Sequence, residues 1–133
     1  MTSRLPANLR QAVAERALHT CEYCGITEAM TYFGCHVDHI IAEKHGGDSG
    51  FDNLCYACVF CNRAKGSDIG SLDPASGNFV RFFNPRLDTW AEHFRREGVR
   101  IEPVSDIGMV TVRILKFNDP DRLMERLAAR AGE

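Results

Sequence analysis

The alternation of apolar and polar positions divides the first part of the chain into one helix and one strand. Segment 6–18 opens with a proline suited to a first helical turn, and Leu9, Val13 and Ala17 recur at helical spacing. A lead-in helix is therefore expected over 6–18. Segment 35–41, CHVDHII, is rich in residues that favour extended backbone and predicts a strand.

The middle of the chain predicts a loop, a second strand and a short helix. Turn-forming residues fill 42–53, after which Asn53 and Leu54 are expected to begin a strand that pairs with the first. Segment 56–65, YACVFCNRAK, contains no helix breaker and is followed by Gly66, as a short helix would be. The expected order is strand, loop, strand, helix.

The last third of the chain shows weaker periodicity. Segment 67–78 is rich in turn residues, and 78–83 is a second strand candidate. Asn84 and Pro85 suggest the cap of a helix running to Gly98. Its apolar face would consist of Leu87, Trp90, Ala91 and Phe94. Beyond it we expect an extended segment over 99–104 and a last helix from Asp119–Pro120 to near Gly132. Segment 106–117 fits both an alternating strand pattern and a helical pattern, and we favour a helix.

The length of 133 residues and an apolar share of 44% fit a single domain spanning 1–133. Within it we distinguish the lead-in helix 6–18, a core over 21–66 and a C-terminal extension over 67–133. The chain has no apolar run long enough to cross a bilayer, and its first residues lack the pattern of a secretory signal. We expect a cytoplasmic protein without membrane contact.

Six cysteines in such a chain favour metal binding over disulfides, because the cytosol keeps thiols reduced. Two CxxC pairs separated by 33 residues predict a closed tetrahedral sulfur site, which is usually a structural zinc site. The expected ligands are Cys21, Cys24, Cys58 and Cys61. Cys58 and Cys61 would share one face of the predicted helix.

The remaining cysteines leave alternatives open. Cys55 with Cys58 also forms a CxxC pair, so the register of the second ligand pair is not unique. Cys35 and Cys55 fall on the two predicted strands, where core packing or a close unbonded pair is expected. If they did pair on oxidation, the protein could serve as a redox or zinc sensor.

Asp38 and His39 are the residues best suited to phosphodiester chemistry. Such cleavage needs an activated water and a cation on the scissile phosphate. A neutral imidazole near pH 7 can take a proton from water, and a carboxylate suits a hard divalent cation. Neighbouring residues of a strand point to opposite faces, so both can serve one site only at a strand end or a bulge.

Further polar residues could complete this site. The amide oxygen of Asn62, next to Cys61, could hold the cation opposite Asp38. Asn53 could hydrogen-bond the loop backbone and so position His39. Phosphate contacts are expected from Arg63 and Lys65. His36 should share a strand face with Asp38 and could bind the metal or contact phosphate, the alternative being a surface or packing histidine.

A formal charge of −2 means that nucleic-acid contacts must come from a local basic surface or a bound cation. Thirteen of the sixteen basic residues are arginine. The densest basic region contains Arg81, Arg86, Arg95, Arg96 and Arg100, diluted by Asp88, Glu92 and Glu97. A solvated face with ion pairs and a nucleic-acid contact surface explain this region equally well.

The stretches HVDHIIAEKHGG, DNL and ACVFCNRAKG resemble the ββα-metal (His-Me finger) core of HNH endonucleases, including those with flanking zinc cysteines. The resemblance covers about residues 21–66. It differs from the family pattern at Ala42, where a proline is usual. Beyond Gly66, NPR followed by TWAEHF is similar to bacterial HNH-family proteins of unassigned role.

The resemblance implies an α+β fold with a zinc-stapled ββα-metal core, an N-terminal helix and a mixed α/β C-terminal extension. It assigns Asp38 as a metal-binding acid, His39 as general base, Asn53 as loop support and Asn62 as second metal ligand. We therefore expect a DNA endonuclease that uses Mg²⁺ or Mn²⁺ and leaves 5′-phosphate and 3′-hydroxyl ends. The alternative is a catalytically silent nucleic-acid- or protein-binding adaptor. A homodimer partner or an accessory subunit is expected to assist target recognition.

Overall fold

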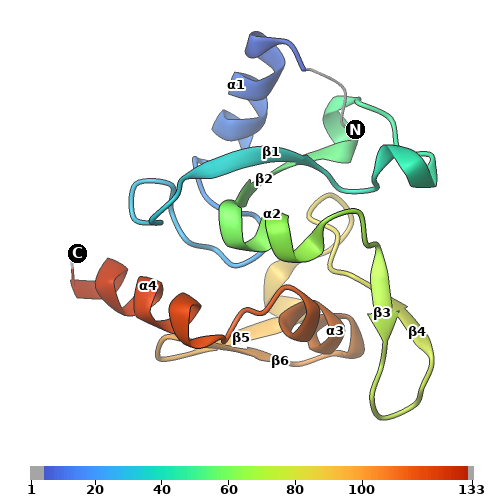
Figure 1. Cartoon of the computed structure of the whole chain (residues 1–133), viewed down its shortest axis with the longest axis vertical. Coiled ribbons are helices and arrows are strands. Elements are labelled where there is room, and N and C mark those ends of the chain that lie inside the picture. Colours follow the sequence, from blue (N-terminus) through green and yellow to red (C-terminus); the bar gives the residue numbers. More distant parts are fainter. Residues whose placement is uncertain (1–4, 132–133) are drawn as a thin grey trace.

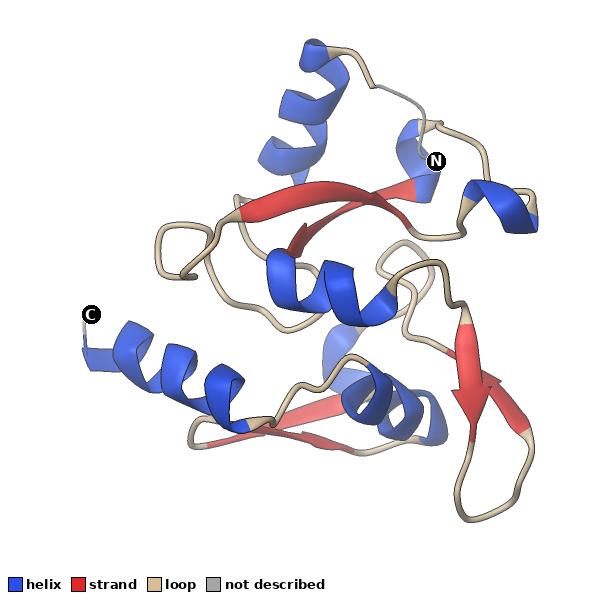
Figure 2. Cartoon of the chain, viewed as in Figure 1, coloured by secondary structure: helices blue, strands red, loops and turns tan. Residues whose placement is uncertain are grey.

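A computed structural model describes residues 5–131 and contains both helices and strands (Figures 1 and 2). The last helix was expected to end near Gly132, which lies outside the described residues. The helices are α1 (Ala7–Arg16), α2 (Val59–Lys65), α3 (Asp106–Ile114) and α4 (Pro120–Ala131). The strands are β1 (Cys35–His39), β2 (Leu54–Cys58), β3 (Gly70–Leu72), β4 (Phe79–Arg81), β5 (Phe94–Glu97) and β6 (Arg100–Pro103).

Strands β1 and β2 form an antiparallel pair, and α2 follows β2 without a loop. The register sets Cys35 opposite Cys58 and His39 opposite Leu54. All five residues of β2 are buried, because α1 covers the strand pair from one side and α2 lies on the other (Figure 1). The predicted order of strand, loop, strand and helix is thus observed, with two short 3-10 turns inside the loop.

The boundary between β2 and α2 differs from the prediction. Residues 56–58 were assigned to the helix, but they continue β2 and pair with β1. The helix begins at Val59, and Cys58 precedes it with extended backbone as its N-cap residue. Helix propensity gave way to strand pairing here because these residues are buried in the sheet. Cys58 and Cys61 therefore do not share a helix face, although they remain neighbours in space.

Helix α1 covers the strand pair and is fixed to it at its last residue, Arg16. The Arg16 guanidinium donates hydrogen bonds to the carbonyls of Phe51 (2.8 Å) and Leu54 (2.5 Å). Its Cζ also lies 3.7 Å from the centroid of the Phe51 ring. These contacts attach the N-terminal helix to the point where the loop enters β2.

The helix predicted from Asn84 to Gly98 is wrong. Asn84 caps a turn, a 3-10 turn covers Trp90–Glu92, and β5 then pairs with β6 in a hairpin closed at Gly98. Trp90 and Phe94 still pack together in the core, whereas Leu87 is 76% exposed. Their helical spacing was misleading because the apolar side chains reach the core from a turn and a strand.

The C-terminal extension forms a second layer beneath α2 (Figure 1). It contains the β5–β6 hairpin, α3 and α4, and the smaller β3–β4 hairpin projects to one side. The helices over 106–117 and from Pro120 agree with the prediction, as does the extended segment at β6. Within the described part of the chain, no helix is long and apolar enough to cross a membrane.

Candidate functional site

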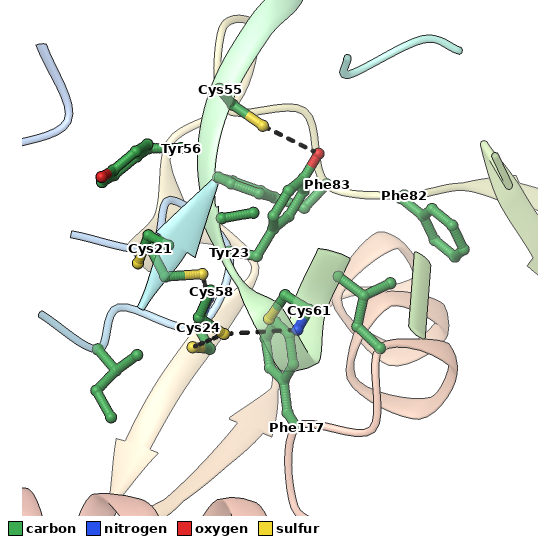
Figure 3. Packing of buried hydrophobic residues seen from close by; sticks show 14 of the residues in the cluster. Cys21, Tyr23, Cys24, Cys55, Tyr56, Cys58, Cys61, Phe82, Phe83 and Phe117 are labelled. Atoms are coloured by element: carbon green, nitrogen blue, oxygen red, sulfur yellow. Dashed lines mark hydrogen bonds between the residues drawn. The ribbon is translucent and has the colours of Figure 1, made fainter. Parts of the chain in front are cut away.

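The four predicted zinc ligands converge between the turn after α1 and the start of α2. The Sγ atoms of Cys21, Cys24, Cys58 and Cys61 all lie within 4.8 Å of one another, and all four residues are buried. The backbone N–H of Cys24 donates a hydrogen bond to Cys21 Sγ (3.4 Å), and the backbone N–H of Cys61 donates one to Cys58 Sγ (3.5 Å). Figure 3 shows the four sulfurs gathered beneath Tyr23.

This geometry fits a tetrahedral zinc ion. Zn–S bonds of about 2.3 Å place two sulfurs of a tetrahedron about 3.8 Å apart, and the Cys24 and Cys58 sulfurs lie 3.7 Å apart. Burial raises the pKa of Cys21 and of Cys61, whereas hydrogen bonds from Cys21, Cys58 and Cys61 lower that of Cys24. A bound cation would favour the thiolate form of the buried Cys21 and Cys61. The cluster of four cysteines therefore indicates zinc binding, and no ligand position is left for substrate.

Arg122 of α4 lies against these sulfurs. Its Nη2 donates to Cys61 Sγ at 3.0 Å and lies 3.8 Å from Cys58 Sγ. Burial opposes its charge, but the Cys61, Cys24 and Cys58 sulfurs hold the pKa of Arg122 above its usual value. A tetrathiolate zinc site carries two net negative charges, and a guanidinium at this distance offsets part of them.

The other two cysteines take no part in the cluster. Cys55 lies opposite Asp38 in the register and donates to the Tyr23 hydroxyl at 3.6 Å, away from the four sulfurs (Figure 3). Cys35 lies opposite Cys58, three positions from Cys55 along the pair, so the two are not close neighbours. Burial raises the pKa of Cys35 to about 12 and raises that of Cys55 too. These are packing residues, which disfavours the sensor hypothesis.

A pocket of about 260 Å³ lies beyond the C-terminal end of α2, and Asp38, His39 and Asn62 all line it. Strand β1 ends at His39, which explains how two consecutive residues reach one pocket. The remaining lining residues come from the loop after β1 and the turn after α2: Ala42, Glu43, Lys44, Gly66 and Ser67. The three side chains that the sequence singled out for cleavage chemistry are therefore neighbours.

Lys65 was expected to contact phosphate, but it is 2% exposed and lies beneath this pocket. Its Nζ donates to the His39 carbonyl at 2.9 Å and lies 3.0 Å from Asp38 Oδ2. The second contact is an ion pair without the geometry of a well-directed hydrogen bond. Burial raises the pKa of Asp38, and the Lys65 ammonium opposes that shift. Lys65 thus holds the end of α2 to the end of β1.

Asn53 fixes the loop that follows His39. Its Oδ1 accepts from the backbone N–H of Ile41 (3.0 Å), and its Nδ2 donates to the carbonyls of Ile41 (3.0 Å) and Asp48 (2.7 Å). The expected contact between this side chain and the loop backbone is present. His39 is 5% exposed, and its Nε2 lies 3.0 Å from the hydroxyl of Ser49 in the same loop.

The two remaining predicted contact residues lie elsewhere. Arg63 is exposed on α2 and lines a second pocket with Phe60, Lys116 and residues of α4. His36 is exposed on β1 but faces a groove against α1, lined by Arg10 and Tyr56 among others. The structure therefore does not bring His36 into the pocket of Asp38.

Comparison with known families identifies the segment that carries both sites. Residues 21–68 match the sequence model of the HNH endonuclease family. The chain contains an HNH domain. No curated protein and no solved structure matches the chain.

The HNH domain indicates a nuclease or nucleic-acid-related function, since nucleases of this family act on nucleic acid. Its match ends at residue 68, so β3 to β6, α3 and α4 lie outside it.

Sequence reasoning missed several residues around the HNH domain. Ser49 sits in a run of turn residues, where a hydroxyl gives no distinctive signal. Lys65 was recognised as basic, but only the fold shows that its side chain turns inward. Arg122 lies 61 residues from Cys61, and no local pattern links the two.

Proposed function

We propose that β1, β2 and α2 form the ββα-metal core of a DNA endonuclease within a single domain. The observation that carries this proposal is the common pocket of Asp38, His39 and Asn62. In an HNH domain these positions would supply an acid and a base at the end of β1 and an amide from the middle of α2.

Asp38 and Asn62 would hold a divalent cation, Mg²⁺ or Mn²⁺. A carboxylate and an amide oxygen suit hard cations, and Mg²⁺ sites often use one or two protein ligands with water and phosphate completing the shell. When bound, the cation would stabilise negative charge on the scissile phosphate and the leaving oxygen. Lys65 keeps Asp38 in place from the opposite side.

His39 would take the proton from the attacking water. Its contact with Ser49 and the three hydrogen bonds of Asn53 fix the imidazole and the loop behind it. A positioned general base contributes about 10²- to 10⁴-fold to a rate. Attack by water on phosphorus with departure of the 3′ oxygen gives 5′-phosphate and 3′-hydroxyl ends.

The test is cleavage of supercoiled plasmid with Mg²⁺, Mn²⁺ or Ni²⁺. We expect His39→Ala to lower the nicking rate by about 10²-fold or more, and Asn62→Ala to raise the cation concentration required. The matched control is His45→Ala, because His45 is exposed in the same loop and does not line the pocket. Equal cleavage by native protein and His39→Ala would exclude this mechanism.

Two observations support a second candidate, a nucleic-acid- or protein-binding adaptor without turnover. Asp38 already has a cationic partner in Lys65, and His39 is largely buried. An adaptor would bind nucleic acid or its protein partner equally well when EDTA removes Mg²⁺ but spares the zinc, and it would never nick plasmid. Nicking that disappears in His39→Ala would dismiss it.

A further inference from the structure

The basic region around β5 and β6 is largely neutralised by ion pairs, with one exception. Four of its five arginines have a carboxylate partner: Arg81 with Asp88, Arg86 with Glu22, Arg95 with Glu97, and Arg100 with Glu102. Arg96 has none among residues 5–131. It is exposed, and its Cζ lies 4.9 Å from the centroid of the Trp90 ring.

Arg96 points to a pocket of about 130 Å³ between the zinc-binding turn and α4. The side chain lies directly on the backbone of Gly25, where an added Cβ would be 2.3 Å from Arg96 Nη2. Arg126 and Arg130 of α4 line the same pocket. The other lining residues are Gly25, Ile26, Thr27, Met30, Gly98, Val99 and Ala129.

No carboxylate lines this pocket, so Arg96, Arg126 and Arg130 have no acidic partner among its lining residues. Within the described part of the chain, neither Arg126 nor Arg130 forms an ion pair either. Arg126 is held in place by hydrogen bonds to the carbonyls of Val99 and Phe117. Arg96 and Arg130 are exposed and can meet a ligand from solvent.

We propose that this pocket binds a phosphate group of the nucleic-acid backbone. Guanidinium groups suit phosphate because their N–H groups match its oxygens in pairs. This inference rests on the proposed function, since it takes DNA as the ligand. It also locates the local basic surface that a chain of net charge −2 needs in order to hold a polyanion.

The pocket is separate from the proposed cleavage site. Gly25 follows Cys24, whose sulfur contacts that of Cys58 just before α2 begins. The Asp38 pocket is lined by Asn62 in the middle of α2 and by Gly66 and Ser67 just beyond its end. A seven-residue helix is about 10 Å long. A phosphate in the arginine pocket would therefore lie away from the scissile bond and position the strand rather than take part in cleavage.

The test compares two double variants of the full chain by fluorescence anisotropy with a labelled DNA duplex, without added divalent cation. Arg96→Gln with Arg130→Gln removes the two exposed pocket charges. Arg95→Gln with Arg100→Gln removes two ion-paired charges from the same hairpin. We expect the pocket variant to bind DNA about tenfold more weakly at low salt. The slope of log Kd against log salt concentration should be smaller by about 1–2. The control variant should bind like native protein.

The cleavage rate with Mg²⁺ at saturating protein should stay within about twofold of native in the pocket variant, since a positioning contact does not touch the reacting atoms. If native protein binds and cleaves DNA and the pocket variant binds DNA equally well, the phosphate pocket is excluded while the proposed function stands. Equal weakening in both double variants would also exclude the phosphate pocket, because diffuse charge would then explain binding. If native protein neither binds nor cleaves DNA, the proposed function fails as well.

Two further measurements guard the interpretation. If the double variant does not fold, as judged by circular dichroism, Arg130→Glu alone replaces it, because Arg130 is exposed in the last turn of α4. Inorganic phosphate at matched ionic strength tests for a free anion. Thermal stabilisation of native protein by phosphate, combined with unchanged DNA affinity in the variant, would assign the pocket to a small anion and overturn the proposal.

Discussion

Residues 21–66 and residues 67–131 are held together by different chemistry. In the first region four thiols converge on one point, and their spacing is local enough to read along the chain. The second region has apolar side chains from β5, β6 and α3 in its core, but α4 turns charged residues inward. Arg122, Glu125 and Arg126 are 3%, 1% and 7% exposed.

Two of these buried charges contact the first region, whereas Arg126 donates to the Val99 and Phe117 carbonyls within the extension. Arg122 donates to Cys61, while the Glu125 carboxylate accepts from the Thr31 hydroxyl (2.8 Å) and the Tyr32 backbone N–H (2.9 Å), in the loop between the zinc-binding turn and β1. An isolated extension would leave the buried Glu125 carboxylate without these donors, and Arg122 would keep only its contacts with the Leu115 and Lys116 carbonyls. Burying a charge without enough partners is costly. The extension is therefore built onto the sulfur cluster and depends on it.

The largest expected effect comes from removing zinc. Structural zinc sites contribute an apparent 10–16 kcal/mol or so, which matches or exceeds the whole stability of an ordinary domain, about 5–15 kcal/mol. Chelation should therefore unfold both regions together. Trp90 lies in the extension, and its indole N–H donates to the Tyr23 carbonyl (2.7 Å), so its fluorescence should change together with far-ultraviolet circular dichroism. A native Trp90 signal in zinc-free protein would mean that the regions are independent.

Arg122→Met should have the next largest effect. It removes the buried positive charge beside Cys61 and leaves the sulfur cluster without its partner, at a cost of about 3 kcal/mol. Urea denaturation measures this loss, and transfer of zinc to a coloured chelator should become faster. Arg122→Lys keeps the charge and should lose less. Zinc transfer at the native rate from Arg122→Met would show that the guanidinium does not stabilise the bound ion.

Glu125→Leu should cost about 2 kcal/mol, because it leaves the Thr31 hydroxyl and the Tyr32 N–H buried without an acceptor. Glu125→Gln retains an acceptor oxygen and should cost about half as much. Zinc transfer from both variants should stay close to native, which separates this contact from that of Arg122. Asp121→Asn, in the exposed first turn of α4, is the control in urea denaturation.

Asp88→Asn should have the smallest effect, because its contacts stay within the extension. The two hydrogen bonds from Arg81 (2.7 and 2.9 Å) hold the pKa of Asp88 below its usual value of 3.8. A lowered folded pKa contributes stability that is present above about pH 4 and lost as the pH falls through the folded value. The difference between native protein and Asp88→Asn should be about 1 kcal/mol at pH 6 and should shrink as the pH falls below about 4 towards the folded pKa. A difference independent of pH would contradict this account.

The sequence predicted what local spacing encodes. The two CxxC pairs, a strand through Asp38 and His39, and a short helix before Gly66 are all observed, because each depends on neighbouring residues. The proposed site of Asp38, His39 and Asn62 could be predicted from the sequence for the same reason. Strand β1 ends at His39, two residues before the end of the predicted segment 35–41.

Contacts between residues far apart in the chain could not be predicted from the sequence. The 84–98 segment forms a turn and a strand because β6 pairs with it, and Lys65 turns inward because Asp38 lies within its reach. Neither partner can be read from local periodicity. The pairing of Arg122 with Cys61 is of the same kind.

Arg16 sets a limit on how the chain can be shortened. The family match begins at residue 21, yet this side chain of α1 donates to the Phe51 and Leu54 carbonyls and covers the Phe51 ring. A fragment of residues 21–68 would lose these Arg16 contacts, which flank Asn53, together with the extension. The smallest autonomous piece of this protein should therefore begin before α1, outside the segment that defines the family.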